Sequence, residues 1–269
     1  MPHSTTRDGV RVYYEEHGRG EPVLLAYGIG GNAGMWEPNI GALSAGHRLI
    51  LWEPRGHARS DSPEDPKKVT FAHWVWDLHD LMDHLEIDRA VVGGLSLGGG
   101  IATRFTLAHP TRVRALLIID SSSASGLPLG VDNIVMRAKS IEVTLKGGMD
   151  AMAEFAIESN PNVAGRIKLD PSARNEIFDY YRRLTPIGYA NALRALLQMD
   201  YITDRLGEIT APTLLVCGDE DPSLGPMREI QKRIAHARFA LLSLAGHFAN
   251  RDQPVAFNRA VVEFLSGLA

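Results

Sequence analysis

Short, continuous apolar runs that alternate with helical patterns constrain this chain more than any other feature. Runs of this kind occupy residues 22–28, 48–54, 89–96, 114–121 and 213–221. Strands that are buried on both faces have continuous apolar sequences of this kind, because helices cover both sides of a parallel sheet. The pattern therefore predicts an α/β fold with a mostly parallel, doubly wound sheet.

Further elements follow from the spacing of the remaining apolar residues. Strands are expected at 11–18 and 238–247, and helices at 71–85, 101–110 and 253–266. The chain has 269 residues, of which 45% are hydrophobic, and this is enough for one large core. A single α/β domain, with at most one inserted subdomain, is expected.

The segment 126–205 interrupts this rhythm. It contains the helix-like stretches IVMRAKSIEVTL and SARNEIFDYYRRL but no convincing core strand. We interpret it as a helical cap inserted between two strands, so that the α/β core consists of residues 1–125 and 206–269. The alternative is a set of ordinary crossover helices.

Charge and motif content exclude several classes of function. The net charge is −4 without a long run of either sign, which argues against a nucleic-acid surface or a membrane patch. The sequence contains no run of about 18 or more apolar residues, so no membrane span is expected. No phosphate loop, cysteine cluster or HExxH pattern is present, so neither a cofactor nor a metal is expected. His79 and His84 are expected on a solvated helix face.

The cellular setting and the partners are only broadly constrained. Cys217 is the one cysteine, and MPHSTTRDG at the start is polar, so a cytoplasmic location is expected. The expected partner is a small-molecule substrate. The sequence leaves open whether the protein is a monomer or a homodimer.

The segment Gly94-Leu95-Ser96-Leu97-Gly98 matches G-x-S-x-G between an expected strand and an expected helix. A sharp turn there would hold Ser96 in a strained conformation and expose its hydroxyl. Glycines two residues before and after it remove side chains that would collide across the turn. Ser96 is the candidate nucleophile, and the Leu97 N–H, at a helix start, is a candidate oxyanion donor. The alternative is a structural turn.

A serine nucleophile needs a base and an acid, in the chain order serine, acid, histidine for this strand–turn–helix context. His247 follows the expected strand 238–247 and is the candidate base. Asp221 is the candidate acid, with Asp219 as its rival, because Asp221 lies in the loop beyond the preceding strand. Both loops are expected at the carboxyl edge of the sheet, where open α/β sheets bind ligands.

Taken together, these motifs resemble the α/β-hydrolase family over nearly the whole chain. The family usually has an HG turn followed by a tryptophan, and here YGIGG at 27–31 is followed by Trp36. It also has a D-x-R-G-x-G-x-S segment, which reads EPRGHARS at 53–60. The resemblance implies that the Ile29 N–H is the second oxyanion donor. The GLS elbow and the segment 188–212 resemble the 3-oxoadipate enol-lactonase branch.

The chain departs from the family pattern at three positions. Tyr27 stands where histidine is usual, and it either shapes the oxyanion loop, places a hydroxyl near the substrate or packs, with packing favoured. Ala58 replaces a glycine, which is tolerable if its backbone angles are ordinary. Gly94 stands where many relatives have histidine beside the elbow.

The resulting hypothesis is a serine hydrolase that cleaves an ester or lactone through an acyl-enzyme on Ser96. The alternatives are C–C or amide bond hydrolysis, perhydrolysis, and a hydrolase-like small-molecule receptor. The expected pocket is apolar, which suggests a hydrophobic acyl or ring portion. Its candidate substrate-binding residues are Tyr27, Trp36, Met136, Tyr180, Tyr189 and Phe248, and Ile29, Leu127 and Leu224 are further candidates for its lining.

Overall fold

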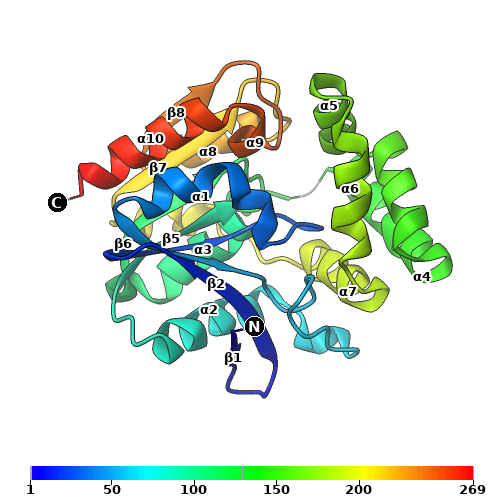
Figure 1. Cartoon of the computed structure of the whole chain (residues 1–269), viewed down its shortest axis with the longest axis horizontal. Helices are drawn as coiled ribbons and strands as arrows, with labels where there is room; N and C mark the ends of the chain where they lie inside the picture. Colours follow the sequence, from blue (N-terminus) through cyan, green and yellow to red (C-terminus); the bar gives the residue numbers. More distant parts are fainter. Residues whose placement is uncertain (1, 129, 269) are drawn as a thin grey trace.

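A computed structural model describes residues 2–128 and 130–268, and a central sheet organises them. The sheet has eight strands in the order β1-β2-β4-β3-β5-β6-β7-β8. Strand β2 pairs antiparallel with both β1 and β4, and all other neighbours are parallel. The predicted mostly parallel sheet is therefore confirmed (Figure 1). The strands are β1 (His3–Thr5), β2 (Arg11–His17), β3 (Glu21–Ala26), β4 (His47–Trp52), β5 (Ala90–Leu95), β6 (Val113–Ile119), β7 (Thr213–Gly218) and β8 (Arg238–Leu242).

The strand boundaries differ from the sequence prediction mainly at two carboxyl ends. Strand β7 ends at Gly218 and β8 ends at Leu242, earlier than the predicted ends at 221 and 247. The residues after these ends form the loops that carry Asp221 and His247. Strand β1 has only three residues and no apolar run, so nothing in its sequence distinguishes it from a loop.

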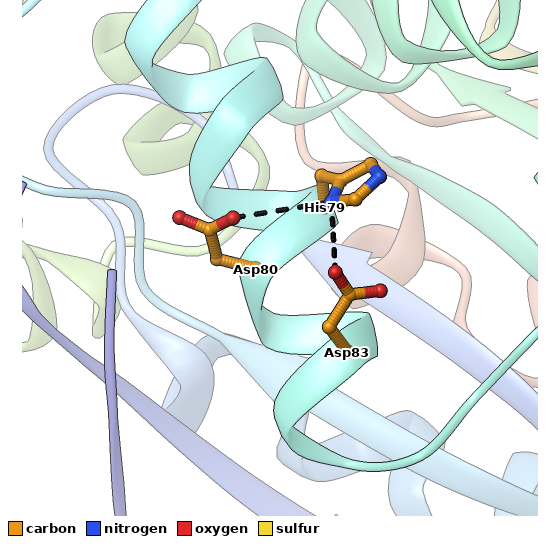
Figure 2. Close-up of side chains that lie close together, drawn as sticks. All are labelled: His79, Asp80 and Asp83. Carbon is orange, nitrogen blue, oxygen red and sulfur yellow. Dashed lines mark ion pairs between the residues drawn. The ribbon is translucent and has the colours of Figure 1, made fainter. Parts of the chain in front are cut away.

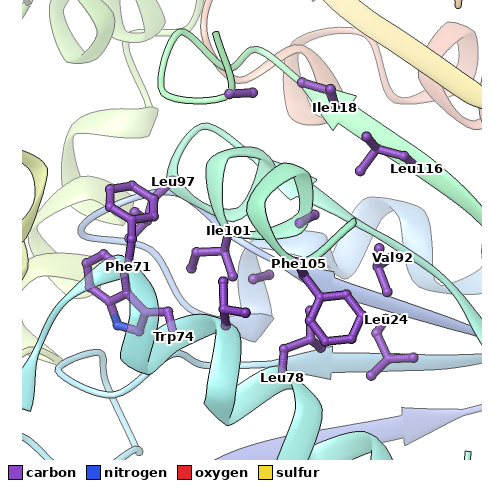
Figure 3. Close-up of a cluster of buried hydrophobic side chains, with 14 of the residues drawn as sticks. Leu24, Phe71, Trp74, Leu78, Val92, Leu97, Ile101, Phe105, Leu116 and Ile118 are labelled. Carbon is purple, nitrogen blue, oxygen red and sulfur yellow. The ribbon is translucent and has the colours of Figure 1, made fainter. Parts of the chain in front are cut away.

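Helices cover both faces of the sheet, because successive strand residues point to opposite sides. One face is covered by α2 (Phe71–His84), α3 (Leu97–Ala108) and α8 (Leu224–Arg233), and the other by α1 (Glu37–Ser44), α9 (Ala249–Asp252) and α10 (Pro254–Ser266). Figure 3 shows the core between α2, α3 and the sheet, where Trp74 and Phe105 are fully buried. This packing fixes α3 and therefore the turn that precedes it.

Four helices lie between β6 and β7 in sequence, within the predicted cap. They are α4 (Val131–Ser159), α5 (Pro161–Leu169), α6 (Ala173–Arg182) and α7 (Pro186–Leu197). They lie together to one side of the sheet in Figure 1 and share a hydrophobic cluster that includes Met152, Tyr181 and Leu193. Helix α4 is interrupted at Gly148, whose φ is 74°. The division of the chain into a cap of 126–205 and a core remains a prediction.

Polar contacts join the cap helices to the loop beyond β8. Arg166 on α5 forms an ion pair with Asp252 at 3.2 Å. The same Asp252 accepts a hydrogen bond from the Gly246 N–H at 2.9 Å. Arg251 also pairs with Glu176 on α6. These contacts fix the cap against the residues on either side of His247.

Short 3-10 helices complete the described structure, at Ala33–Trp36, Pro66–Lys68, Pro110–Arg112 and Thr203–Glu208. Among residues 2–128 and 130–268, none of the helices has the length and apolar character that crossing a membrane requires.

Candidate active site

The candidate nucleophile Ser96 occupies the single residue between β5 and α3. Its φ of 53° and ψ of −112° lie in a region that side chains rarely adopt, at a cost of about 1–3 kcal/mol. The Ser96 N–H donates to the Ile119 carbonyl at 2.8 Å, and its carbonyl accepts from the Ser121 and Ser123 hydroxyls at 2.6 and 2.9 Å. These bonds hold the strained turn that the G-x-S-x-G pattern predicts.

The glycines around Ser96 let the turn lie directly against the end of β3. A Cβ added at Gly94 or at Gly98 would stand 2.3 Å from the Ala26 carbonyl oxygen. A Cβ at Gly28 would stand 3.1 Å from the Ser96 Cβ. The glycines therefore remove collisions, as the sequence predicts. A side chain at these positions would collide with the neighbouring strand β3 as well as with the turn itself.

Replacing Gly98 with alanine should disrupt this contact. We expect G98A to lower the free energy of unfolding by about 2–3 kcal/mol, because the new Cβ meets a backbone oxygen that has no room to move. Gly165 in α5 is a matched control, since a Cβ there meets nothing within 4 Å. We expect G165A to raise the free energy of unfolding by about 0.5–1 kcal/mol. Urea unfolding measures both, and equal effects would contradict the steric argument.

His247 and Asp221 meet in the loops that follow β8 and β7. The His247 Nδ1 lies 3.0 and 3.2 Å from the two carboxylate oxygens of Asp221. The Ser223 N–H donates to the same carboxylate at 2.9 Å. Both side chains are buried, whereas the rival Asp219 is exposed and accepts only a long contact of 3.4 Å from the Ala245 N–H. The structure thus pairs His247 with Asp221.

The environment of this pair favours charge on both partners. Burial of the imidazole lowers the pKa of His247, but the Asp221 carboxylate, together with the more distant Asp120 and Asp252, outweighs burial, so the pKa is raised above 6.5. Burial alone would raise the pKa of Asp221. The charge and hydrogen bond of His247 outweigh that effect, so the pKa of Asp221 lies below 3.8. An imidazolium formed at His247 is therefore stabilised by a carboxylate that stays ionised.

Ser96 and His247 line one cavity of about 280 Å³ between the sheet edge and the cap helices. Because Nδ1 of His247 bonds to Asp221, Nε2 is the ring nitrogen available to a nucleophile. The Ser96 hydroxyl makes no hydrogen bond within residues 2–128 and 130–268. Such contacts are often long in unliganded hydrolases and shorten when substrate binds.

Asp120 is a second buried acid beside this pair, and the sequence reasoning did not single it out. Its two oxygens accept hydrogen bonds from the Gly218 and Ala249 N–H groups, both at 3.0 Å. Gly218 begins the Asp221 loop and Ala249 follows His247, so Asp120 ties the two loops together. Burial and the nearby Asp221 charge hold the pKa of Asp120 well above 3.8. The sequence signal that could have identified Asp120 is its position directly after the apolar strand segment ALLII.

The candidate oxyanion donors Leu97 and Ile29 belong to two segments that border the same cavity as Ser96. Leu97 is the first residue of α3, and the first N–H groups of a helix have no intrahelical acceptor. Ile29 lies in the loop after β3 and lines the same cavity. Glu53 holds this loop, because its carboxylate accepts the Ala33 N–H at 3.0 Å and the Arg59 N–H at 2.8 Å. Glu53 stands where the family pattern has aspartate, and both of its carboxylate oxygens accept hydrogen bonds.

Two of the departures from the family pattern have clear structural outcomes. The Tyr27 ring packs edge-to-face on Trp36, and its hydroxyl donates to Asn250 at 3.0 Å, away from Ser96. Packing therefore accounts for Tyr27, although its ring also borders the cavity. Ala58 has a φ of 38°, so the condition of ordinary backbone angles is not met and this residue is strained.

Most of the candidate substrate-binding residues line the cavity, and Trp36 does not. Met136, Tyr180, Tyr189 and Phe248 all border it, as does Ile29. Trp36 is 1% exposed and lies between Tyr27 and Phe257 in the core. The further candidates Leu127 and Leu224 also lie outside the lining.

The cavity lining is also more polar than predicted. It includes Arg137, Asn133 and Ser140 from α4, which the search for apolar residues overlooked. The sequence signal for these three residues is their helical spacing relative to Met136, which places all four residues on one face of α4.

Two clusters of potential metal ligands occur among the described residues, and neither offers free ligands. Figure 2 shows His79 beside Asp80 and Asp83 on α2, with ring-to-carboxylate distances of 3.9 and 3.2 Å. The two carboxylates already pair with Arg7 and Arg112. The second cluster is Asp120, Cys217 and Asp221, whose carboxylates hold the loops described above. His79 is partly exposed on this helix face, and its ring contacts both carboxylates.

A second, open hollow of about 680 Å³ lies near the amino ends of β3, β6, β7 and β8. Glu21, Arg114 and Arg238 are among its lining residues. None of the residues discussed around Ser96 borders it.

Comparison with known proteins agrees with this fold. A family model of the alpha/beta hydrolase fold matches residues 21–140. The chain is 26% identical over 284 residues to 3-oxoadipate enol-lactonase 1 of Acinetobacter baylyi, covering 98% of this chain and 96% of that protein. It is 28% identical over 265 residues to 2-hydroxy-6-oxo-6-phenylhexa-2,4-dienoate hydrolase of Comamonas testosteroni, covering 94% and 91%. A thermophilic esterase from Thermogutta terrifontis has a similar structure, with a TM-score of 0.88, 26% identity and coverage of 99% and 98%.

Proposed function

Since the chain is a hydrolytic enzyme with the α/β-hydrolase fold, of the ester- or lactone-cleaving type, we propose that it acts through an acyl-enzyme on Ser96. The observation that carries this proposal is the relation of three side chains. Ser96 lies on a strained turn that borders the cavity, His247 borders the same cavity, and Asp221 holds the far nitrogen of the imidazole.

In the proposed mechanism, Ser96 Oγ attacks the substrate carbonyl while Nε2 of His247 takes the hydroxyl proton. Asp221 keeps Nδ1 protonated and stabilises the imidazolium. The N–H groups of Ile29 and Leu97 bind the tetrahedral oxyanion. His247 then protonates the leaving alkoxide, and an ester links the acyl group to Ser96.

Deacylation repeats these steps with water as the nucleophile. His247 removes a proton from water, the second oxyanion forms in the same place, and the acid is released as the proton returns to Ser96. When the substrate is a lactone, the alcohol stays tethered to the acyl group. Release then gives a single hydroxy acid, or its keto tautomer when the lactone is an enol ester.

The cavity volume of about 280 Å³ limits the substrate to a small molecule. Aromatic side chains of the cap, such as Tyr180 and Tyr189, face the catalytic loops across this space. They favour a compact acyl or ring portion over a long fatty chain. The polar lining on α4 means that the substrate is not purely hydrophobic.

The test is hydrolysis of a panel of substrates. A pH-stat follows the esters and lactones, because each turnover releases one proton near neutral pH. An ammonia assay follows the amide, because the ammonia it releases takes up that proton. The panel contains acetate and butyrate esters, a medium-chain ester, a γ-lactone, an enol lactone and a primary amide. We expect turnover of short esters or lactones and none of the amide. Turnover of the amide alone would contradict the proposed bond type. A burst of one product per chain without further turnover would instead support the receptor hypothesis.

A further inference from the structure

Two serines in the loop after β6 donate hydrogen bonds to the backbone carbonyl of the candidate nucleophile, and the proposed mechanism gives them no role. The hydroxyls of Ser121 and Ser123 lie 2.6 and 2.9 Å from the carbonyl oxygen of Ser96. The Gly100 N–H in the first turn of α3 donates to the same oxygen at 3.1 Å. The carbonyl before a helix ordinarily accepts one such intrahelical bond. The two hydroxyls are therefore additional donors.

Two glycines of α3 make room for these hydroxyls. Gly99 and Gly100 follow the G-x-S-x-G segment but are not part of it. A Cβ added at Gly99 would stand 2.9 Å from the Ser121 hydroxyl oxygen, and one at Gly100 would stand closer still to that of Ser123. Glycine is less favourable than alanine within a helix. The approach of the two serines, and not helix formation, therefore accounts for these glycines.

The surroundings of the two hydroxyls direct both of their protons to the Ser96 carbonyl. The hydroxyl oxygens lie 3.2 Å apart, which is longer than the distance from either one to the carbonyl oxygen. The Ser121 hydroxyl accepts the Ala124 N–H at 3.2 Å, which leaves its proton for the carbonyl. Ser121 and Ser123 are both buried, and a buried hydroxyl is costly unless it is hydrogen-bonded. Water therefore does not replace these bonds.

Helix α3 also holds the serine loop in place. Arg104, one turn beyond Gly100, donates to the Ser123 carbonyl at 3.0 Å and to the Gly100 carbonyl at 3.2 Å. Its guanidinium is buried and forms an ion pair with Asp200 at 2.9 Å. The two donors to Ser96 are thus fixed relative to the start of α3 before any substrate binds. Groups that stabilise a transition state need this kind of preorganisation.

The Ser96 carbonyl and the Leu97 N–H belong to one peptide group. Hydrogen bonds that form a chain polarise one another, so donors on this carbonyl strengthen the N–H at the other end of the group. We propose that Ser121 and Ser123 are positioning residues that polarise the Ser96–Leu97 peptide and thereby strengthen the Leu97 N–H as an oxyanion donor. This inference rests on the proposed function and adds two side chains to its oxyanion-binding machinery.

The kinetic test compares S121A, S123A and the double variant with the wild type on the butyrate ester of the panel. Loss of a single hydroxyl should lower kcat by about 2- to 7-fold, because each bond strengthens one oxyanion donor by a modest fraction. The double variant should lose more than either single variant, and KM should change little. S125A is the matched control, since Ser125 is a buried serine of the same loop that donates to the Ser122 carbonyl instead. It should keep the wild-type kcat.

Isotope labelling measures the polarisation directly in the free enzyme. Serine labelled with ¹³C at its carbonyl and leucine labelled with ¹⁵N select the Ser–Leu peptides in a carbonyl–amide NMR correlation. The chain has three of them, Ser96–Leu97, Ser223–Leu224 and Ser243–Leu244. In the double variant, the carbonyl and amide signals of the first should move to lower frequency, as they do when hydrogen bonds to a carbonyl are lost. The other two peptides are internal controls and should not move, and S96A identifies the Ser96–Leu97 signal by removing it.

The two measurements together separate this role from a merely structural one. Circular dichroism confirms the fold of each variant, and the single variants carry the comparison if the double variant does not fold. A shift of the Ser96–Leu97 signal without a loss of kcat would overturn the inference. A loss of kcat without that shift, or an equal loss in S125A, would also overturn it, because the serines would then only hold the loop. Turnover by S96A would overturn the proposed function, and the labelled signal distinguishes that failure from a failure of the polarisation itself.

Discussion

Replacing Ser96 with alanine is expected to lower kcat by at least about 10⁴-fold, with the fold unchanged. The covalent intermediate requires the Oγ atom, and no other side chain occupies the position between β5 and α3. The oxyanion donors are backbone N–H groups, so S96A keeps them and retains only the small acceleration they supply. Initial rates in a pH-stat, with the best substrate of the panel, measure the loss.

The backbone strain at position 96 provides a separate test of how substitutions there affect the stability of the fold. Glycine tolerates a φ of 53° better than serine or alanine does, so S96G should raise the free energy of unfolding by about 1 kcal/mol. S266A, at an exposed position near the end of α10, is the control for serine removal and should keep full activity. Substantial turnover by S96A would exclude the acyl-enzyme mechanism.

The parts of the site that the sequence predicts are those determined by local backbone geometry. The elbow required glycines at 94 and 98, a strand before it and a helix after it, and all of these are visible within about ten residues. The loops with Asp221 and His247 were placed by the rule that parallel strands end at one sheet edge. Their pairing needed only the order of the strands.

The features that the sequence does not predict depend on contacts between distant segments. Trp36 was expected to line the cavity, but the 3-10 helix Ala33–Trp36 turns it into the core against Phe257. Asp120 was overlooked because its role needs the amide groups of two loops more than 90 residues away. Arg137 was overlooked because only the packed cap shows that its side chain borders the cavity and that its Nη1 atom makes no hydrogen bond within residues 2–128 and 130–268.

The assignment of the acid rests on the choice between Asp221 and Asp219, and D221N is expected to decide it. We expect kcat to fall by about 10⁴-fold, because an amide facing Nδ1 favours the wrong imidazole tautomer. D219N is the matched control, two residues away and with the same change of charge. Asp219 is exposed, so D219N should stay within about threefold of wild-type activity.

The pH profile distinguishes a role for Asp221 from a merely structural one. In the wild type, Asp221 contributes most among the nearby carboxyl groups that raise the pKa of His247 above 6.5 against the effect of burial. His247 must be neutral to act as a base, so kcat/KM should rise with pH through that raised pKa. Without the carboxylate, burial dominates and the pKa of His247 falls. The acidic limb of the residual activity in D221N should therefore move to lower pH.

The control variant makes this result decisive. D219N should keep the wild-type pH profile, because Asp219 lies outside the hydrogen-bond distance of the imidazole and acts only across solvent. A shifted acidic limb in D219N, with an unshifted one in D221N, would transfer the acid role to Asp219. A large loss in D221N with no shift would mean that Asp221 positions the loop without acting on the imidazole charge. In this second case His247 would need another source for its raised pKa, and Asp120, which ties both loops, would be the residue to vary next.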